Sequence, residues 1–296
     1  MTNDIRHFIN LPDIGSDALK GIIKQAHALK AEKFSPPQIM EGLSLAMVFD
    51  KRSTRTRMSF ELAMKQLGGH TLVMSMDDMQ ITGAESMQDT GAVLSRYVDG
   101  IMIRMSDHAQ LEELSRNTTI PVISGMTNDS HPCQIMADIL TIEEKLGDIQ
   151  GKKVAWFGDY NNVVKTFEQA APLFDFELVI STPEDLYDKS IAPQEAAKDA
   201  DVIVTDTWIS MGEEGKTIDK FMPYQVNADL MAHAKDSAIF MHCMPIHKDE
   251  EVTPEVLASD ACVIYDEAEN RLHAQKAILA WSMESAGVRL QKPTGS

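Results

Sequence analysis

Cysteine is scarce in this chain of 296 residues, which contains only Cys133, Cys243 and Cys262. Three widely spaced cysteines do not make a disulfide framework, and their scarcity is typical of a protein in a reducing compartment. The chain also lacks any run of about 18 apolar residues, the length that a membrane span requires. Its first residues, MTNDIRHFIN, lack the basic and then apolar pattern of a signal peptide. These features predict a cytoplasmic protein with no membrane partner.

Basic residues are also few compared with acidic ones. Lysine and arginine total 27 against 45 acidic residues, which gives a formal net charge of −18, and no long basic tract is present. Nucleic-acid binding depends on neutralising phosphates with lysine and arginine over a broad surface. The composition therefore predicts no nucleic-acid partner, although a small anion in a local basic pocket remains compatible with it. The length is sufficient for two globular domains, and neither repeats nor low-complexity tracts occur.

One basic cluster stands out against this acidic background. Residues 53–57, with the sequence STRTR, place three hydroxyls and two guanidiniums between an apolar run, Leu43–Phe49, and a helical pattern, Met58–Leu67. Free amide groups at a helix N-terminus and forked arginine side chains both favour an anion such as phosphate. The motif thus indicates a small-anion site on a strand-to-helix turn. The alternative is an ordinary capped helix with solvated arginines, and the motif alone leaves both interpretations open.

Apolar runs alternate with helical patterns along the whole chain, which predicts an α/β fold with largely parallel sheets. A helix with an apolar face at Ile135, Ile139 and Ile142, ending at Gly147, is expected to bridge the two halves, and a closing helix is expected around Ala274–Ala286. We therefore predict two doubly wound parallel-sheet lobes joined by a bridging helix. About four strands are expected in each half, and the candidates are Leu43–Phe49, Thr71–Ser75, Gly100–Arg104, Pro121–Ser124, Val154–Phe157, Leu178–Ser181, Val202–Asp206, Ala238–His242 and Val263–Asp266.

Polar segments follow several of the predicted strands of the second half, at the edge where doubly wound sheets bind ligands. Ordinary loops also follow strands, so it is the number of these segments that favours a ligand site. The segments are GDYNN after Phe157, TDTWISMG after Val204, MHCMP after Phe240 and YDEAENR after Ile264.

Single residues in these segments allow other interpretations. His131 precedes a proline and is compatible with a simple turn residue. His242, Cys243 and His247 are possible metal ligands, but strand alternation would put His242 and Cys243 on opposite faces, so we expect no metal site. Cys243 is compatible with a nucleophile, although no partnering histidine follows from the sequence. The GDYNN segment lacks the glycines of a dinucleotide-binding turn, and we expect no cofactor.

Taken together, six motifs resemble those of the aspartate/ornithine carbamoyltransferase superfamily, and within it the enzymes that act on ornithine. They are STRTR at 53–57, HPCQ at 131–134, GDYNN at 158–162, DTWISMG at 206–212, HCMP at 242–245 and ENRLHAQ at 269–275. The resemblance covers nearly the whole chain in order. It implies a carbamoyl-phosphate domain, residues 1–133 with about 275–296, an ornithine domain, residues 134–274, an active site between them, and a homotrimer or a multiple of trimers.

The resemblance also implies a reaction, the transfer of a carbamoyl group from carbamoyl phosphate to the side-chain amine of L-ornithine, giving L-citrulline and phosphate. Thr56 and His131 are expected to donate to the carbonyl oxygen, and Gln134 to hold the carbamoyl nitrogen, with help from the main chain at Cys243 and Met244. The residues expected to bind carbamoyl phosphate are Ser53, Thr54, Arg55, Thr56, Gln80, Arg104, His131, Gln134, Cys243, Met244 and Arg271. Gln80 matches a loop residue that reaches the neighbouring subunit's site in this family.

The ornithine site is expected to combine Asn162 and the Met211 backbone for the carboxylate with Asp206 and Ser210 for the α-ammonium. The side-chain amine, with a pKa near 10 in water, has to react uncharged, and desolvation beside arginines favours the neutral form. Asp206 and Cys243 line the expected path of this amine, but no general base is evident. Positioning and charge stabilisation are expected to dominate catalysis, with the departing phosphate as proton acceptor. The set expected to act in catalysis is Arg55, Arg104, His131, Gln134, Asp206, Cys243 and Arg271.

Some positions depart from the family pattern. Met244 stands where leucine is usual, and Tyr160, Val164 and Lys165 replace smaller residues around the asparagine pair. Putrescine, acetylornithine or succinylornithine is therefore a rival second substrate, although the SMG loop and Asn162 favour ornithine. An NAD-dependent dehydrogenase and a noncatalytic relative are rival functions. The sequence does not choose between arginine biosynthesis and the reverse, catabolic direction.

Overall fold

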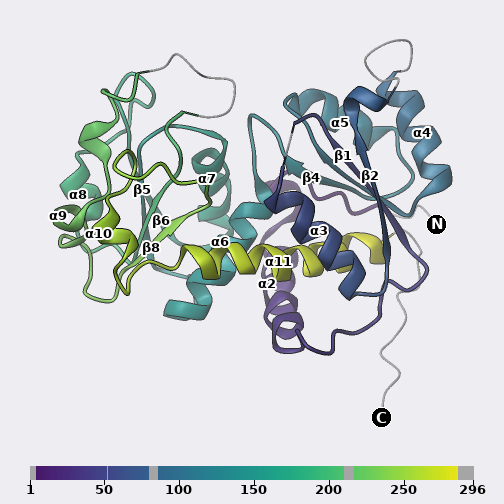
Figure 1. Ribbon diagram of the computed structural model, residues 1–296, viewed down its shortest axis with the longest axis horizontal. Helices are drawn as coiled ribbons and strands as arrows, with labels where there is room; N and C mark the ends of the chain where they lie inside the picture. The colour runs from purple at the N-terminus through teal and green to yellow at the C-terminus, as the bar shows by residue number, and fades with distance from the viewer. Residues whose placement is uncertain (1–4, 52, 80–85, 210–216, 286–296) are drawn as a thin grey trace. The chain divides into compact units, whose positions relative to one another are not determined.

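The computed structural model describes residues 5–51, 53–79, 86–209 and 217–285. The chain divides into two compact units (Figure 1). Unit 1 comprises the chain up to Leu140 together with the chain from Asn270, and unit 2 comprises Thr141–Glu269. Two helices, α6 (Pro132–Leu146) and α11 (Ile264–Glu284), contribute residues to both units.

Unit 1 contains a four-stranded parallel sheet with the order β2-β1-β3-β4. Phe49, at the end of β1, pairs in register with Arg104, at the end of β3, so the carboxyl ends of these strands lie side by side. The strands are β1 (Ser44–Phe49), β2 (His70–Ser75), β3 (Gly100–Arg104) and β4 (Val122–Met126). The helices of this unit, besides the two shared ones, are α1 (Leu11–Ile14), α2 (Ser16–Ala31), α3 (Arg55–Gln66), η1 (Met76–Asp78), α4 (Met87–Tyr97) and α5 (His108–Arg116).

The core of unit 1 follows from strand alternation. Ala46 and Val48 of β1 share one apolar cluster with Met87 of α4 and Leu111 of α5. The alternate residues of β1, such as Met47, point to the other face and are also fully buried. Both faces of the sheet are therefore covered, as is usual for parallel sheets.

Unit 2 repeats this architecture with the strand order β6-β5-β7-β8, again all parallel. Its core joins Phe157 of β5, Ile203 of β7 and Phe240 of β8 to residues of the flanking helices. The strands are β5 (Lys153–Phe157), β6 (Glu177–Ser181), β7 (Val202–Thr205) and β8 (Ile239–His242). The helices are α7 (Asn162–Phe174), α8 (Pro193–Ala197), η3 (Met222–Tyr224), α9 (Ala228–Met231) and α10 (Pro254–Leu257).

The predicted α/β fold with two doubly wound parallel sheets is confirmed, and α6 runs where the bridging helix was expected. The strand predicted at Val263–Asp266 is wrong. Cys262 forms only an isolated bridge to Phe240 of β8, and α11 begins directly afterwards at Ile264. The closing helix therefore begins ten residues before the predicted Ala274. No helix among the described residues combines the length and the apolar character needed to cross a membrane.

Candidate active-site residues in the two units

The predicted anion-binding motif lies where β1 leads into α3. As expected from the sequence, the helix begins within the motif, at Arg55. Thr54 occupies the N-cap position and makes no side-chain hydrogen bond to the helix. The first amides of an α-helix have no intrahelical partner, so this end of α3 has donors and a positive dipole end to offer an anion.

Arg104 extends from the carboxyl end of β3 towards this motif. Its Nη1 donates hydrogen bonds to Ser53 Oγ (2.9 Å) and Thr56 Oγ1 (3.3 Å). The position of Arg104 follows from the sheet, because its in-register partner Phe49 is the last residue of β1, four residues before Ser53. Three residues of the predicted carbamoyl-phosphate set are thereby in direct contact.

Arg271 and Gln134 join the same group from α11 and α6. Arg271 Nη1 donates to Gln134 Oε1 (2.6 Å), and Arg271 Nη2 donates to Thr56 Oγ1 (3.3 Å). The other end of the Gln134 amide is held by Asp138, whose Oδ1 accepts from Nε2 (2.7 Å). Arg271, Gln134 and Thr56 are all nearly fully buried, so the geometry of this group is fixed by packing as well as by hydrogen bonds.

His131 precedes α6 and is also buried. Burial lowers the pKa of His131 well below its usual value, and the positive charges of Arg271, Arg104 and Arg55 lower it further. Burial favours the uncharged imidazole, and nearby cations act in the same direction. At neutral pH His131 is therefore a neutral ring that can donate one hydrogen bond without adding a charge.

Sequence reasoning missed two supporting carboxylates in unit 1. Asp50 accepts from the backbone nitrogen (2.6 Å) and the hydroxyl (2.7 Å) of Ser106, which ties the loop after β1 to the loop after β3. Asp138 orients Gln134 as described above. The detectable signals were an aspartate directly after a buried strand and a polar pair at i, i+4 in an otherwise apolar helix. Gln80 lies outside the described residues.

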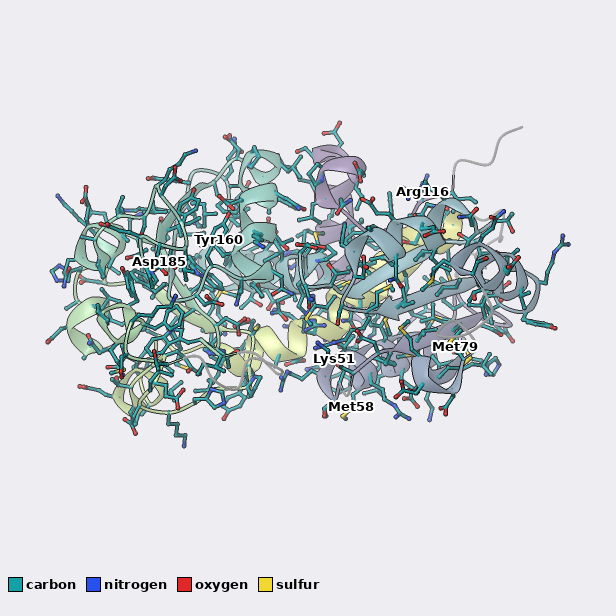
Figure 2. The ribbon with its side chains drawn as sticks, turned by 90° about the horizontal axis from the view of Figure 1, so that it is seen from above. Lys51, Met58, Met79, Arg116, Tyr160 and Asp185 are labelled. Atoms are coloured by element: carbon teal, nitrogen blue, oxygen red, sulfur yellow. The ribbon has the colours of Figure 1, made fainter. Side chains whose placement is uncertain are left out.

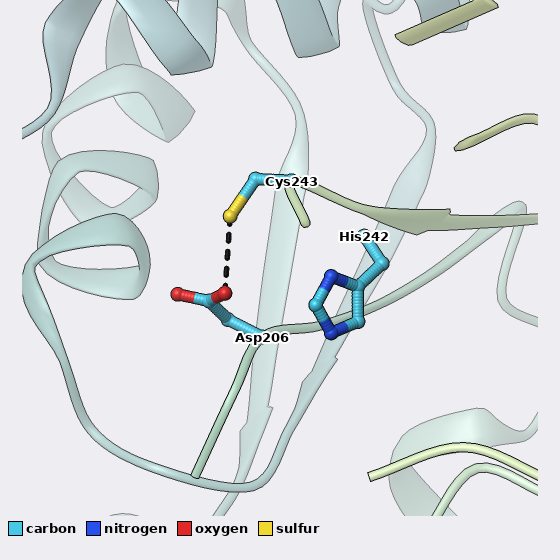
Figure 3. Close-up of side chains that lie close together, drawn as sticks. All are labelled: Asp206, His242 and Cys243. Atoms are coloured by element: carbon cyan, nitrogen blue, oxygen red, sulfur yellow. Dashed lines mark hydrogen bonds between the residues drawn. The ribbon is translucent and has the colours of Figure 1, made fainter. Parts of the chain in front are cut away.

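In unit 2 the predicted site residue Asp206 follows β7 and is buried. Its Oδ1 accepts hydrogen bonds from Cys243 Sγ (3.0 Å), shown in Figure 3, and from the backbone nitrogen of Thr207 (2.8 Å). Its Oδ2 accepts from Asn161 Nδ2 (2.8 Å). The structure thus brings Asp206 and Cys243 into contact and adds Asn161.

Asn161 and Asn162 have different structural roles. Asn161 is the N-cap of α7, and its Oδ1 accepts from the backbone nitrogens of Val163 (2.9 Å) and Val164 (3.4 Å) while its amide nitrogen contacts Asp206. Asn162, the predicted ligand, is the half-buried first residue of α7. Ser210 and Met211 lie outside the described residues.

The turn between β5 and the two asparagines requires a glycine at position 158. Gly158 has a φ of +108°, and a Cβ there would lie 2.4 Å from Nε1 of the buried Trp208. The backbone therefore approaches the indole more closely than any side chain would allow.

A buried network supports the segment that carries Cys243 and Met244. His242 Nδ1 accepts from the backbone nitrogen of Met244 (2.9 Å), so the ring proton resides on Nε2, which donates to Glu251 Oε1 (3.2 Å). The backbone nitrogen of His242 donates to Glu267 Oε2 (2.8 Å). His242, Glu251 and Glu267 are essentially inaccessible to solvent. No local pattern predicts the role of Glu251, because its partner His242 lies nine residues earlier.

Two groups of three potential metal ligands occur among the described residues: Asp206, His242 and Cys243, and separately His247, Glu250 and Glu251. The side chains of the first group are already engaged in hydrogen bonds, since both ring nitrogens of His242 and the thiol of Cys243 make the contacts given above. His247 therefore does not join His242 and Cys243 as the sequence pattern allowed.

Tyr160, one of the departures from the family pattern, is held in place by a hydrogen bond and by ring stacking. Its hydroxyl donates to Glu168 Oε2 (2.5 Å), and its ring stacks on Tyr187 with the centroids 4.9 Å apart. Burial and Glu168 raise the pKa of Tyr160, so it stays protonated at neutral pH. Figure 2 labels Tyr160 within unit 2.

Each unit therefore presents a distinct chemistry. Unit 1 offers guanidiniums, hydroxyls and a neutral imidazole, which suit a phosphate joined to a polar carbonyl group. Unit 2 offers a buried carboxylate next to an amide and a thiol, which suits an ammonium group.

Comparison with known proteins agrees with this chemistry. Residues 6–144 match the family model described as "Aspartate/ornithine carbamoyltransferase, carbamoyl-P binding domain", and residues 189–282 match "Aspartate/ornithine carbamoyltransferase, Asp/Orn binding domain".

Similar proteins cover almost the whole chain. The ornithine carbamoyltransferase of Brucella ovis is 48% identical, with 97% of this chain and 98% of the relative covered. That of Mesorhizobium japonicum is 47% identical, with 94% and 99% covered. The solved structure of ornithine carbamoyltransferase from Pyrococcus furiosus superimposes with a TM-score of 0.90 and 44% identity, covering 94% of this chain and 97% of that one.

Proposed function

This chain belongs to the aspartate/ornithine carbamoyltransferase family, and we propose that it transfers the carbamoyl group of carbamoyl phosphate to the side-chain amine of L-ornithine. The products are L-citrulline and phosphate. The observation that carries the proposal is the convergence of Arg104 and Arg271 on the hydroxyl of Thr56, beside a histidine that burial keeps neutral.

We assign unit 1 the carbamoyl phosphate. The amides at the start of α3, with Ser53, Thr54 and Arg55, hold the phosphate oxygens, and Arg104 spans the phosphate and the carbonyl oxygen. Thr56 Oγ1 already accepts from two guanidiniums, so its own hydrogen is free to be donated to the carbonyl oxygen. The side chains of Gln134 and His131 complete the set, on the carbamoyl nitrogen and the carbonyl oxygen.

The reaction forms a bond between the neutral side-chain nitrogen of ornithine and the carbonyl carbon, and breaks the bond from that carbon to the phosphate oxygen. Negative charge develops on the carbonyl oxygen in the transition state, where Thr56, His131 and Arg104 stabilise it. The amine loses one proton, which the departing phosphate accepts. Binding both substrates in a reactive arrangement supplies much of the remaining acceleration.

We assign unit 2 the ornithine. Asp206, fixed by Asn161 and Thr207, pairs with the α-ammonium together with Ser210, while Asn162 and the Met211 backbone bind the carboxylate. Cys243 donates a hydrogen bond to Asp206, and we assign it to the path of the reacting amine. The carbonyls of Cys243 and Met244 help to hold the carbamoyl nitrogen. Carbamoyl phosphate is expected to bind before ornithine.

The setting of the reaction is also part of the proposal. We place the protein in the cytoplasm, in arginine biosynthesis or in the reverse reaction of arginine catabolism. None of the three cysteines, all of which lie among the described residues, forms a disulfide, and this is compatible with a reducing compartment.

The proposed assembly is a homotrimer or a multiple of trimers. Apolar side chains on α3 and on the edge strand β2 support it: Met58, labelled in Figure 2, is 57% exposed, Leu62 is 40% exposed and Leu72 is 53% exposed. Met58 and Leu62 lie one turn apart on the same face of α3, and exposed apolar side chains that are grouped in this way commonly mark protein interfaces. Gln80 is proposed to act in the site of a neighbouring subunit. Light scattering on the purified protein tests the assembly, and a monomeric mass would overturn it.

A substrate panel tests the function. Purified protein is supplied with carbamoyl phosphate and, in parallel, with ornithine, putrescine, acetylornithine or succinylornithine, and phosphate release and the carbamoylated product are both measured. Turnover with ornithine alone is expected. Turnover of another amine would retain the assignment of unit 1 and overturn that of unit 2, and no turnover with any amine would favour a noncatalytic relative.

A further inference from the structure

The loop that follows β8 brings together three side chains that have no assigned contact with either substrate. His247 Nδ1 lies 3.8 Å from Glu250 Oε2 and 3.8 Å from Glu251 Oε2. One ligand atom from each residue lies within 4.8 Å of the others. An imidazole nitrogen and two carboxylate oxygens form a donor set typical of a divalent transition-metal ion.

The backbone holds this arrangement in place. The nitrogen of Glu250 donates to the carbonyl of His247 (3.1 Å), which closes a turn, and Gln225 Nε2 donates to the carbonyls of Asp249 (3.0 Å) and Glu250 (2.8 Å). The nitrogen of Val226 donates to the carbonyl of Glu251 (3.0 Å). The three side chains therefore project from a braced loop and not from a freely moving one.

Glu251 provides independent evidence for a ligand. Its side chain is completely buried, and Oε1 accepts from His242 Nε2 (3.2 Å) and from the backbone nitrogen of His247 (2.5 Å). Oε2 is buried without any hydrogen-bond partner. An unsatisfied buried carboxylate oxygen is costly, and buried charges are normally paired or bound to a metal. This oxygen points to the gap shared with His247 and Glu250.

We propose that His247 Nδ1, Glu250 Oε2 and Glu251 Oε2 bind one divalent transition-metal ion such as Zn²⁺, with water completing the coordination. Zinc lies about 2.0–2.2 Å from such nitrogen and oxygen ligands, which places tetrahedral ligands roughly 3.4 Å apart. The two separations from His247 Nδ1, 3.8 Å each, need to close by only a few tenths of an ångström, and the third pair of ligand atoms lies within 4.8 Å. His247 and Glu250 are partly exposed, so an ion can enter from solvent.

The proposed ion would be linked to the segment that carries Cys243 and Met244. Glu251 binds the ion through one oxygen and His242 through the other, and His242 in turn accepts from the Met244 nitrogen. A carboxylate between a metal and a histidine fixes the orientation of both. The ion is therefore a structural brace for this loop, outside the carbamoyl-transfer chemistry.

Cobalt is the probe for the first test, because Co²⁺ substitutes for Zn²⁺ and its absorption spectrum reports the type of ligand. The purified full-length protein, freed of metal by dialysis against a chelator, is titrated with CoCl₂ and followed by absorption and calorimetry. The variants are His247→Gln and Glu250→Gln, and Glu255→Gln is a control that makes the same charge change as Glu250→Gln on an exposed residue of α10.

One tight ion per chain is expected, with no thiolate charge-transfer band in the cobalt spectrum. His247→Gln and Glu250→Gln should each weaken this binding at least about 10-fold, since even partners behind the ligands contribute 10- to 100-fold. Glu255→Gln and Cys243→Ala should bind as the wild type does. Unchanged binding in both His247→Gln and Glu250→Gln, or a thiolate band that disappears in Cys243→Ala, would overturn the proposal.

Discussion

Thr56 allows a sharp test of how the reaction is catalysed. Its Oγ1 accepts hydrogen bonds from Arg104 and Arg271, both at 3.3 Å, and its side chain is buried. A hydroxyl oxygen has two acceptor positions and one hydrogen to donate. Because the two guanidiniums occupy the acceptor positions, the hydrogen is directed elsewhere, and we assign it to the carbonyl oxygen of carbamoyl phosphate.

Thr56→Val removes this donor while keeping the shape of the side chain. Loss of one donor to a developing oxyanion lowers kcat by about 100- to 1,000-fold, or about 3–4 kcal/mol of transition-state stabilisation. Thr56→Ser retains the hydroxyl and is expected to stay within about 10-fold of the wild type. The valine variant also deprives two guanidinium hydrogens of an acceptor, so some loss of stability, about 1–3 kcal/mol, is expected as well.

The assay is citrulline formation at saturating concentrations of both substrates, so that kcat reports the chemical step and not weakened binding. Thermal unfolding of each variant, measured in parallel, separates a loss of folded protein from a loss of catalysis. A folded Thr56→Val variant with a kcat within about 3-fold of the wild type would refute the role assigned to this hydroxyl.

Four further outcomes are expected. Asn161→Asp keeps the helix cap but places a second carboxylate against Asp206, so KM for ornithine should rise about 10-fold or more while KM for carbamoyl phosphate stays unchanged. Burial makes the pKa of His131 lower in the folded protein than in the unfolded chain, so its contribution to stability is fully present above pH 6.5 and is lost as the pH falls towards the folded pKa. The free energy of unfolding in urea should therefore rise with pH by up to about 1.4 kcal/mol per pH unit in this range, and His131→Asn should reduce that slope. Equal slopes for the two proteins would contradict the burial argument. Burial raises the pKa of Cys133 to about 12, so peptide mapping after treatment with a thiol reagent should find this residue unmodified in the native protein. Arg55→Ala should lower kcat/KM by about 1,000-fold, and wild-type turnover would contradict the assigned phosphate site.

The position of the anion motif could be read from the sequence because several local signals agreed. An apolar run, a polar turn and a helical pattern together predict a helix that starts on the STRTR motif, and α3 does begin there, at Arg55. The contacts of Arg104 with this motif required the sheet register, which depends on pairing between β1 and β3 and cannot be read from either segment alone.

The error at Val263–Asp266 has a physical explanation. A short apolar run is compatible with either a buried strand or a buried helix, and here the first residues of α11 follow a single bridge to β8. Asp266 and Glu267 in the first turn were a helix-start signal that the apolar residues outweighed.

Supporting residues were the hardest to find. Asp138, Asn161 and Glu251 act through other side chains, and each contact depends on a helix face or on a loop path that the sequence pattern does not specify. The family resemblance identified Gln134 and Asp206 but not the groups that orient them. His247 was considered with His242 and Cys243, whereas the fold of the loop groups it with Glu250 and Glu251.

The most direct test of the account follows the carbamoyl group itself. Ornithine is incubated with isotopically labelled carbamoyl phosphate and the wild-type protein, and the product is analysed by tandem mass spectrometry. We expect one labelled carbamoyl group on the side-chain nitrogen of ornithine, with labelled product and phosphate formed in equal amounts. Label on the α-nitrogen, or phosphate release without a labelled amino acid, would contradict it.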